Sequence, residues 1–356
     1  MIIDPHVHLR GEEYQGQEFL RKGFRDAKVV GIQALLEMPN PDPQLTSEKI
    51  CNDRIGYVDL IRDGIYHGIN IGLTDDIEQV KSALELVESS SRITADKVFY
   101  VHSTGNMGIL DEDVQREIWK VKGEMKYNGV SMGHFEDEDS FDSEHQFNYK
   151  NPISHSLYQN PESELIQVER QLRNAIDNKF QGTFYICHVS NPDTITYLNQ
   201  QRSEIDFPIV TEMTFHHMFL NWEDYKIHGN RLKMNPPLRS KDMQEQLLEH
   251  VLKGNVDVIG TDHASHTLEK KDSVKPPSGI PALPFWPRGL KMLLELGMSE
   301  QKLQSMSFDK ANEIFELGLT RDCEGFPEEK LIYSPALWNV YGYNPFSRID
   351  GTGEIK

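Results

Sequence analysis

The sequence predicts an α/β fold, a (β/α)8 barrel of the TIM type in which eight parallel strands alternate with helices. Eight short apolar or β-branched runs recur along the chain, and each ends in polar residues before a stretch with helical spacing. The eight units fill roughly 260 residues, which is the usual size of such a barrel. In chain order the runs are Ile2–Ile3, Ile32–Met38, Ile69–Leu73, Lys97–Val101, Val130–Met132, Thr183–Cys187, Phe207–Val210 and Val256–Ile259.

The segments between the runs show the spacing of amphipathic helices. Apolar residues recur every three or four positions, as in Ile77, Val80, Leu84 and Val87. A doubly wound open sheet is the alternative, but it usually has a glycine-rich turn after its first strand. Here the first run leads into the glycine-free segment Asp4–His8, so the barrel is favoured.

Two connections and the C-terminal end depart from the regular unit. The connections Glu136–Asn160 and Phe215–Arg239 are longer than average, and long loops in a barrel are commonly functional. The end of the chain from Cys323 is rich in glycine, proline and aromatic residues. We therefore expect a barrel domain over residues 1–322 and a C-terminal tail over residues 323–356 that packs on the barrel.

Composition limits the possible functions. The 356 residues include 37 Lys and Arg against 56 Asp and Glu, a formal net charge of −19, and no block of basic residues stands out. Nucleic acid and anionic membrane surfaces are therefore poor candidates for partners. No apolar run approaches the ~18 residues of a membrane span, and we see no pattern of a secretory signal. We expect an acidic, cytoplasmic protein with a small-molecule substrate.

The strongest local signal is the pair His6 and His8 in the first unit. Alternate side chains of a strand share one face, so both imidazoles point to the same side, which in a barrel strand is the interior. Two neutral imidazoles are natural ligands for a divalent metal ion such as zinc. Taken alone, the pattern is common, and a pair on the surface or in the core is the alternative.

Three further residues stand where strands are predicted to end. His134 follows the fifth run, His188 ends the sixth and Asp262 ends the eighth. A barrel gathers the carboxyl ends of its strands at one mouth, so these residues should converge with the histidine pair. The sequence thus predicts a metal site at that mouth.

Lys97 opens the fourth run. A lysine that points into a barrel is costly unless something neutralises it. One interpretation places its side chain in solvent, and the other is a carbamylated lysine whose two oxygens bridge two metal ions. The residues alone favour the first interpretation.

Short motifs are spread along nearly the whole chain. The segments are Asp4–Arg10 (D-P-H-V-H-L-R), Met38–Asn40 (M-P-N), Lys97–Met107 (K-V-F-Y-V-H-S-T-G-N-M), His134–Asp137 (H-F-E-D), Cys187–Ser190 (C-H-V-S), His216–Leu220 (H-H-M-F-L), Asn235–Arg239 (N-P-P-L-R) and Thr261–Thr267 (T-D-H-A-S-H-T). They resemble the motifs of the dihydroorotases, in the amidohydrolase superfamily, and follow the family's order over about residues 1–345. Hydantoinases and allantoinases share the metal ligands, but not the combination of H-L-R with M-P-N and N-P-P-L-R.

The resemblance implies a centre of two divalent metal ions per chain, which we expect to be zinc. The implied ligands are His6, His8 and Asp262 for one ion, His134 and His188 for the other, and carbamylated Lys97 as the bridge between them. Water held between the ions would attack the substrate, and Asp262 would act as general base and pass the proton to the departing amide nitrogen. The implied reaction is the reversible hydrolysis of dihydroorotate to N-carbamoyl-L-aspartate in de novo pyrimidine biosynthesis.

Substrate recognition follows the same resemblance. Dihydroorotate carries a carboxylate, and Arg10 offers a planar fork that can hold it through two hydrogen bonds. Arg10 stands two residues after His8, so on an extended strand it would share the face of the ligands. The family pattern implies that Asn40 and His266 share this contact and that Asn235 hydrogen-bonds the ring. An ordinary surface arginine is the alternative for Arg10.

Several features depart from the family pattern. Gly11–Tyr14 follows Arg10 where a glutamate and then Pro-Gly are common, Phe135 stands where a small residue is usual, and Ser265 replaces a common proline. These changes affect loops and leave the implied ligands intact. Many relatives carry a small β domain, of which we expect at most a remnant from Leu331 onward.

Other polar residues near the motifs have a structural interpretation. We expect His217 to pack or to support a ligand rather than to bind metal. Glu136 and Asp137 are more typical of an exposed acidic pair, with an outer partner for His134 as the alternative. The three cysteines are far apart, which argues against a disulfide framework, and we interpret them as small buried hydrophobic residues.

Two rival functions remain open. Another cyclic-amide hydrolase, such as a hydantoinase or an allantoinase, is disfavoured by Arg10, because neutral hydantoins have no carboxylate. A non-catalytic relative that serves as a partner of aspartate transcarbamoylase should have lost ligands, whereas all six positions are filled here. The partners left open are a second copy of the chain, in a homodimer, and aspartate transcarbamoylase.

Overall fold

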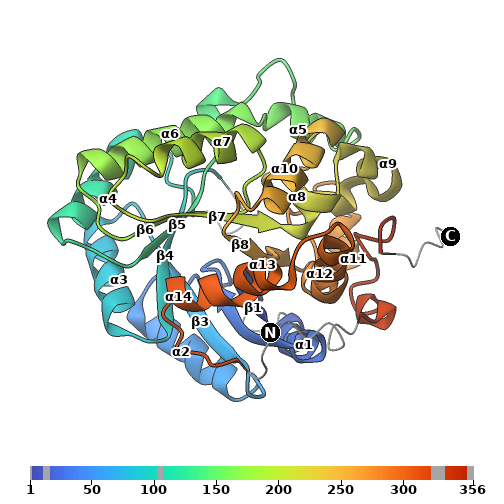
Figure 1. The fold of residues 1–356 in the computed structure, drawn as a ribbon, viewed down its shortest axis with the longest axis horizontal. Helices are drawn as coiled ribbons and strands as arrows, with labels where there is room; N and C mark the ends of the chain where they lie inside the picture. Colours follow the sequence, from blue (N-terminus) through green and yellow to red (C-terminus); the bar gives the residue numbers. More distant parts are fainter. Residues whose placement is uncertain (1, 11–16, 103–106, 322–332, 351–356) are drawn as a thin grey trace.

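The computed structural model describes residues 2–10, 17–102, 107–321 and 333–350. Strands occupy the middle of the molecule and helices surround them (Figure 1). Neighbouring strands all pair in parallel, in the order β8-β7-β6-β5-β4-β3-β2-β1-β9. The strands are β1 (Ile2–His8), β2 (Ile32–Glu37), β3 (Tyr66–Gly72), β4 (Ile93–Phe99), β5 (Val130–His134), β6 (Thr183–Ile186), β7 (Ile209–Thr214), β8 (Val258–Gly260) and β9 (His263–Ala264).

The sheet closes on itself between its first and last strands. β9 pairs with β1, and only Thr261 and Asp262 separate β9 from β8, which pairs with β7. β8 and β9 are therefore two parts of one strand position, and the ring has eight positions. Asp4 of β1 strengthens this junction by accepting hydrogen bonds from the backbone N–H (3.1 Å) and the hydroxyl (2.6 Å) of Thr261. The predicted (β/α)8 barrel is confirmed.

The helices cover the outside of the ring, and several begin at a capping side chain. Ser47, Asp76 and Asp111 each accept a hydrogen bond from a backbone N–H in the first turn of α2, α3 and α4. The helices are α1 (Gln17–Val30), α2 (Glu48–Asp59), α3 (Ile77–Ser89), α4 (Glu112–Glu124), α5 (Ile153–Tyr158), α6 (Glu162–Asp177), α7 (Pro192–Gln201), α8 (Phe215–Phe219), α9 (Tyr225–His228), α10 (Lys241–Lys253), α11 (Leu268–Lys271), α12 (Trp286–Glu295), α13 (Glu300–Gln304) and α14 (Lys310–Ile314).

The interior of the ring is filled from its amino-terminal end. Ile3 and Val130, at the beginnings of β1 and β5, belong to an apolar cluster that also contains Phe308, Ala311 and Phe315. These last three residues lie in or beside α14, so this C-terminal helix closes the amino-terminal end of the barrel. The other end of the barrel, where the strands have their carboxyl ends, is therefore the end at which a functional site can open.

Every predicted run overlaps an observed strand, but the fourth is misplaced. β4 begins at Ile93, so Lys97 lies inside the strand and does not open it. Asp96 hid the beginning of the strand, because a charged residue interrupts the apolar pattern. In the structure Asp96 is buried and paired with Lys122 of α4, whose Nζ lies 2.7 Å from its carboxylate.

The C-terminal residues 333–350 contact the barrel. The Phe346 ring stacks on Phe285 with centroids 3.9 Å apart, and the Tyr341 hydroxyl donates a hydrogen bond of 2.8 Å to Asp26 of α1. The predicted boundary at residue 322, Cys323 and the start of the β remnant at Leu331 lie outside the described residues. The division into a barrel and a tail therefore stays a prediction.

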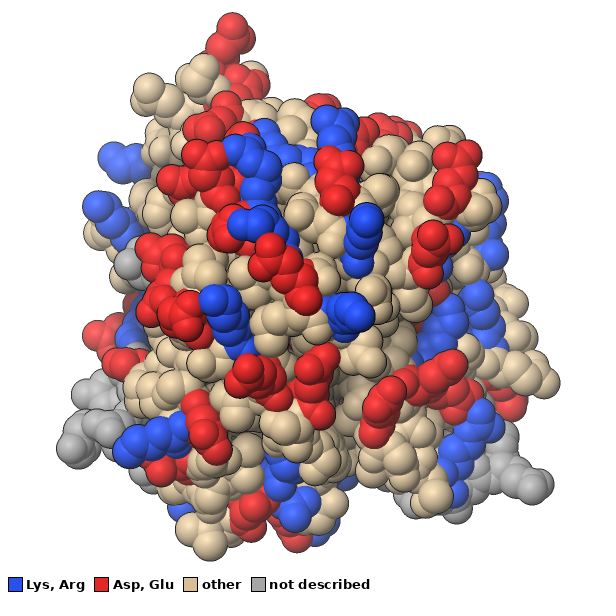
Figure 2. All heavy atoms as spheres, turned by 90° about the vertical axis from the view of Figure 1, so that its left-hand side faces the viewer, with Lys and Arg blue, Asp and Glu red and all other residues tan. Residues whose placement is uncertain are grey.

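Charged side chains of opposite sign are interleaved on the face seen in Figure 2. On α3 and α4 they pair between successive turns, with Lys81 Nζ 2.7 Å from Glu78 and Lys120 Nζ 2.9 Å from Glu117. The expectation that nucleic acid is not a partner stays a prediction. None of the helices in the described ranges combines the length and the apolar character needed to cross a membrane.

Candidate active site

A pocket opens at the carboxyl ends of the strands. Seven of the ten residues predicted for the site line it, namely His8, Arg10, Asn40, His134, His188, Asn235 and Asp262. Phe99, Ala264, Ser278 and Gly279 complete the lining. His6 and Lys97 are buried below the pocket floor, and His266 lies beside the pocket wall formed by Gly279.

The first group of predicted metal ligands converges as the spacing indicated. The Nε2 atoms of His6 and His8 are 3.3 Å apart, and they lie 3.3 and 2.9 Å from the same carboxylate oxygen of Asp262. All three side chains are buried. Burial raises the pKa of Asp262, but the contact with His8 and the charge of His6 outweigh it and hold that pKa well below its usual range. Asp262 is therefore ionised.

The other nitrogen of each ring is tied to a buried acceptor. Glu212 of β7 accepts from His6 Nδ1 at 2.8 Å, and Asn40 Oδ1 accepts from His8 Nδ1. If both rings are neutral, their protons are on Nδ1, and the lone pairs of both Nε2 atoms face the Asp262 carboxylate. Two imidazole nitrogens and a carboxylate oxygen, all hydrogen-bond acceptors, then lie together, and a positive charge between them would stabilise the group. Burial lowers the pKa of His6, but Glu212 and Cys187 outweigh it and raise the pKa to about 10. A proton or a metal ion can supply the missing positive charge, and the group fits a divalent ion.

The second group is formed by His134 and His188, whose ring centroids are 4.5 Å apart. Glu136 holds His134 Nε2 at 2.7 Å, which leaves Nδ1 for a ligand. The His188 ring is buried, and its Nδ1 has no hydrogen-bond partner among the described residues. The centroid of this ring lies 5.2 Å from that of His6, so the two groups are adjacent.

The expectation that Glu136 and Asp137 form an exposed pair is wrong. Both side chains are buried; Glu136 contacts His134, and Asp137 pairs with Arg170 of α6 at 2.9 Å. Glu136 is therefore the outer partner of His134, which was the alternative interpretation. Glu136 stands two residues beyond the end of β5, and the sequence does not reveal that the backbone there brings its carboxylate to the imidazole.

Lys97 points into the barrel, so the interpretation that places it in solvent is wrong. Ala95, Lys97 and Phe99 share one face of β4, and that face is the interior. Lys97 is 0% exposed, and its Nζ lies 3.0 Å from the sulfur of Cys187 and 5.1 Å from the centre of the Phe99 ring. Among the described residues, no carboxylate lies within ion-pair distance of this ammonium.

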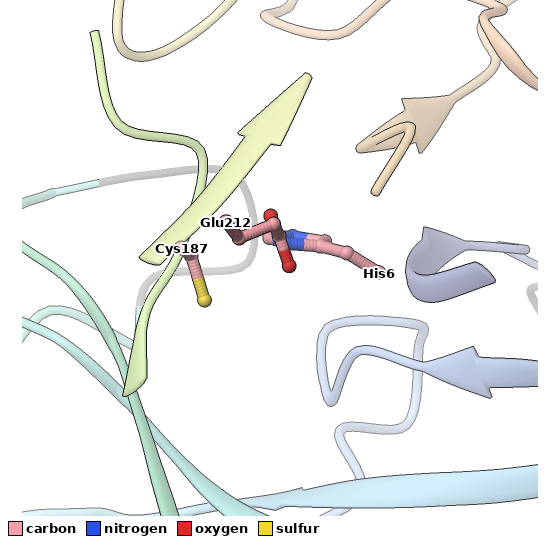
Figure 3. A group of neighbouring side chains, drawn as sticks. All are labelled: His6, Cys187 and Glu212. Carbon is pink, nitrogen blue, oxygen red and sulfur yellow. The ribbon is translucent and has the colours of Figure 1, made fainter. Parts of the chain in front are cut away.

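Cys187 is buried, as expected, but its surroundings are polar. Figure 3 shows Cys187 and Glu212 from the neighbouring positions β6 and β7 and His6 reaching them from β1, and the ligand atoms of the three residues lie within 4.8 Å of one another. Cys187 therefore touches both His6 and Lys97, which the interpretation as a simple apolar residue did not foresee.

Three site residues have left-handed backbone conformations. The φ angles are +58° for Arg10, +35° for His188 and +48° for Asp262. Residues other than glycine rarely adopt such angles, and those that do are enriched at functional sites. Each of the three stands two residues beyond the last residue of its strand, where the chain leaves the sheet, and all three line the pocket.

Arg10 lines the pocket, but not for the predicted reason. β1 ends at His8 and Arg10 is left-handed, so it does not continue the alternation of the strand. Its carbonyl accepts a hydrogen bond from Arg54 of α2, and Arg54 in turn is paired with the buried Glu37. The departure from the family pattern at Gly11–Tyr14 lies outside the described residues.

Asn235 and His266 are joined through Ser278. The Ser278 hydroxyl donates to Asn235 Oδ1 at 3.1 Å, and the Ser278 carbonyl accepts from His266 Nε2 at 2.8 Å. Asn235 lines the pocket, whereas His266 supports its wall. Burial lowers the pKa of His266, with further contributions from Arg10 and Lys271, so its ring is neutral.

The two adjacent histidines after β7 differ. His217 bonds the hydroxyl of Thr214 at 2.9 Å and the carbonyl of Pro236 at 3.2 Å, which is the structural role expected of it. His216 is also buried, but neither of its ring nitrogens has a hydrogen-bond partner among the described residues.

Sequence reasoning missed Glu212 and Ser278. Glu212 interrupts the apolar strand Ile209–Thr214, and a buried acid inside a barrel strand was an available signal. Ser278 lies in a polar loop, where a serine is not unusual, so only the folded structure identifies it as a pocket residue.

Comparison with known sequences gives relatives over most of the chain. No protein-family model matches it. A dihydroorotase of Halobacterium salinarum is 28% identical over 317 residues, which are 88% of this chain and 69% of that protein. A dihydroorotase of Methanosphaera stadtmanae is 29% identical over 311 residues, 82% of this chain and 64% of that protein. The chain spans between 59% and 69% of the length of such relatives.

Comparison with solved structures gives the same barrel. The L-hydantoinase of Arthrobacter aurescens matches with a TM-score of 0.74 at 19% identity, covering 88% of this chain and 70% of that one. The dihydroorotase of Saccharomyces cerevisiae, solved with 5-fluoroorotic acid, matches with a TM-score of 0.72 at 17% identity, covering 90% and 85%. The sequence relatives are named dihydroorotases, and the solved structures show that the chain shares its barrel with hydantoinases and a dihydroorotase.

Proposed function

We propose that this chain, a homologue of the dihydroorotases, catalyses the reversible hydrolysis of dihydroorotate to N-carbamoyl-L-aspartate. One observation carries the proposal: the guanidinium-bearing Arg10 lines the same small pocket as His8, His134, His188 and Asp262. A cation beside a cluster of metal-binding side chains suits a cyclic amide that also bears a carboxylate.

The residues present fit two divalent ions, for which zinc is our choice. His6, His8 and Asp262 would hold one ion, and His134 and His188 the other. When bound, such ions lower the pKa of water between them and polarise the amide carbonyl.

Carbamylated Lys97 would be the ligand shared by both ions. The burial of Lys97 supports this role, because an ammonium inside a barrel is costly without a carboxylate partner. Carbamylation replaces that positive charge by a negative one with two oxygens. The contact of Lys97 Nζ with Cys187 Sγ at 3.0 Å, and the closeness of Cys187 to His6, support a position of the carbamate at the ligand cluster.

Asp262 is the proposed general base. One carboxylate oxygen faces His6 and His8, so the other oxygen is the one that can receive the proton of the attacking water. As the C–O bond forms and the ring C–N bond breaks, the same oxygen returns the proton to the departing nitrogen. In ring closure the transfers run in reverse.

Arg10, Asn40, Asn235 and His266 are the proposed substrate contacts. Arg10 would pair with the carboxylate. Asn40 would share this contact, and its Oδ1 also orients the ring of His8. The Asn235 Oδ1 accepts from Ser278, which leaves NH2 for the ring.

A hydantoinase-like cyclic-amide hydrolase is the second candidate, favoured by the match of the barrel to hydantoinases. An assay of dihydroorotate and N-carbamoyl-L-aspartate beside 5-substituted hydantoins, with metal analysis of the same sample, separates the two. Turnover of dihydroorotate alone is expected, and a preference for neutral hydantoins would contradict the proposal. A cytoplasmic location, a homodimer and aspartate transcarbamoylase as a partner stay predictions.

The bridging role of Lys97 has its own test. Lys97→Ala should lose at least one bound metal ion and, with it, activity, and added short carboxylic acids should restore part of both. Full metal content in this variant would exclude Lys97 as a ligand while leaving the five other ligands in place.

A further inference from the structure

Lys271, the last residue of α11, has its ammonium inside the protein. The residue is 1% exposed. Its Nζ donates to the backbone carbonyls of Lys233 (3.0 Å), Pro277 (3.0 Å) and Gly279 (2.8 Å). An ammonium has three N–H donors, so these three acceptors use all of them. Lys271 is therefore fully committed to the backbone of two loops.

These two loops form one wall of the pocket. The first contains Asn235, two residues after Lys233, and the second contains Ser278 and Gly279; all three line the pocket. The Gly279 N–H donates to the carbonyl of Lys233 at 2.9 Å, which joins the loops directly. Lys271 is not among the residues that line the pocket, and it bridges the same two backbones through their carbonyls.

Hydrogen bonds within this wall connect the two loops to the predicted substrate contacts Asn235 and His266. Lys233 Nζ donates to the Ser278 hydroxyl at 2.6 Å, so that hydroxyl must turn its own proton to Asn235 Oδ1. The Ser278 carbonyl fixes His266 through Nε2 at 2.8 Å. Gly279 lies so close to Ala264 that an added Cβ would come within 2.6 Å of the alanine Cβ. Small shifts of the loop would therefore move both Asn235 and His266.

The charge of Lys271 is held without a counter-ion in the described part of the chain. No carboxylate of the described residues lies within 4 Å of it, in contrast to the buried Lys122, which pairs with Asp96. Burial lowers the pKa of Lys271 well below its usual value, and the charges of Lys233 and Arg10 add to this effect. The three carbonyl oxygens can each accept only an N–H, so these contacts of 2.8–3.0 Å favour the protonated amine against that effect and tie it to both loops.

We propose that Lys271 is a positioning residue for substrate binding, which sets Asn235 and His266 by holding loops 233–235 and 277–279 together and never touches the substrate. The claim about substrate binding rests on the proposed function, whereas the claim that Lys271 holds the two loops together does not depend on it. Because the three contacts of the Lys271 ammonium go to backbone carbonyls and none goes to a predicted metal ligand, loss of Lys271 should weaken substrate binding and leave metal binding intact.

The test compares Lys271→Met with Lys270→Met, a control at the exposed neighbouring position. Lys271→Met should raise KM for dihydroorotate at least about tenfold, with kcat changed less than about threefold and metal content unchanged. Hydrogen exchange of the Gly279 amide should become faster, and this readout needs no substrate. The control variant should match the wild type in all four measurements.

Ser278→Ala serves as a second variant, because it removes the hydroxyl link between Lys233 and Asn235 while Lys271 stays in place. It should raise KM in the same direction even where Lys271→Met fails to fold. An unchanged KM in both variants, or faster exchange with an unchanged KM, overturns the positioning role. If the wild type itself does not turn over dihydroorotate, the proposed function fails, and the exchange rate of Gly279 still decides whether Lys271 holds the loops.

Discussion

The proposed metal-binding end of the pocket, with His6 and His8, and its proposed substrate-binding end, with Arg10 and Asn235, are supported in different ways. His6 and His8 stand on a strand, and the outer nitrogen of each ring is held by a buried side chain, Glu212 or Asn40. Arg10 and Asn235 stand on loops, and their supports are reached through backbone carbonyls and a serine. Side chains on strands need little loop geometry to converge. The barrel strand thus sets His6 and His8, whereas the segments beyond the strand ends set Arg10 and Asn235 and also the proposed ligands His188 and Asp262.

The largest effect is expected at the centre of the metal-binding end. Asp262→Asn should lower turnover of both dihydroorotate and N-carbamoyl-L-aspartate by at least about a thousandfold, because one group takes and returns the proton. Steady-state rates in the two directions measure this, with metal content determined on the same protein. A rate within about tenfold of the wild type, a barrier change of only ~1.4 kcal/mol, would argue against Asp262 as base.

Arg10→Met tests the substrate-binding end. A charged hydrogen bond contributes about 1.5–3 kcal/mol, so kcat/KM for dihydroorotate should fall at least roughly a hundredfold, mostly through KM. Arg10→Lys should restore only part of the loss, because a point charge lacks the fork. Turnover of the neutral ring dihydrouracil should be poor and nearly indifferent to the change. Normal kinetics in Arg10→Met would mean that the carboxylate is held elsewhere.

This difference between the two ends also decides what the sequence could predict. The pattern of β1, with His6 and His8 two residues apart, specified one face of one strand, and the structure places both rings together. Arg10 was assigned to the pocket by strand alternation, yet it reaches the pocket through a left-handed turn after the strand has ended. Lys97 was misplaced because the buried pair of Asp96 and Lys122 disguised the start of β4. An ion pair between two elements, or a turn after a strand, does not change the periodic pattern of apolar residues, so the sequence pattern could not predict either feature.

Glu212→Gln should have a smaller effect, on metal affinity. The Glu212 carboxylate orients His6 and also accepts from the backbone of His188 at 2.9 Å, and loss of such a partner typically lowers metal affinity about 10–100-fold. Competition with a chelator measures it. Tyr185→Phe is the matched control, because it removes only the hydroxyl contact of 2.8 Å to the other Glu212 oxygen. Equal affinity in both variants would contradict an orienting role of Glu212.

The smallest effect on turnover is expected from Glu37→Gln, which removes the support below Arg10 and should act mainly on stability. Glu37 is buried at the end of β2, with Arg54 Nε at 3.0 Å and His67 Nε2 at 2.9 Å. Burial raises the pKa of Glu37, but Arg54 and His67 outweigh it and lower the pKa to about 2. Breaking such a pair leaves Arg54 without its partner, and we expect a loss of about 3 kcal/mol in the free energy of unfolding at pH 7.

The sign of the pH dependence follows from the lowered pKa of Glu37. The folded state holds the carboxylate ionised at pH values where the unfolded chain, with a pKa near 4.5, already binds a proton. The stabilisation is therefore complete above about pH 4.5 and is lost as the pH falls toward 2. Urea unfolding of the wild type and of Glu37→Gln should differ most at neutral pH and converge in acid, whereas Glu85→Gln, an exposed control on α3, should show no such convergence. A difference that stays constant down to pH 3 would mean that Glu37 acts through packing and not through its charge, and the loop end of the pocket would then lack the electrostatic support assigned to it here.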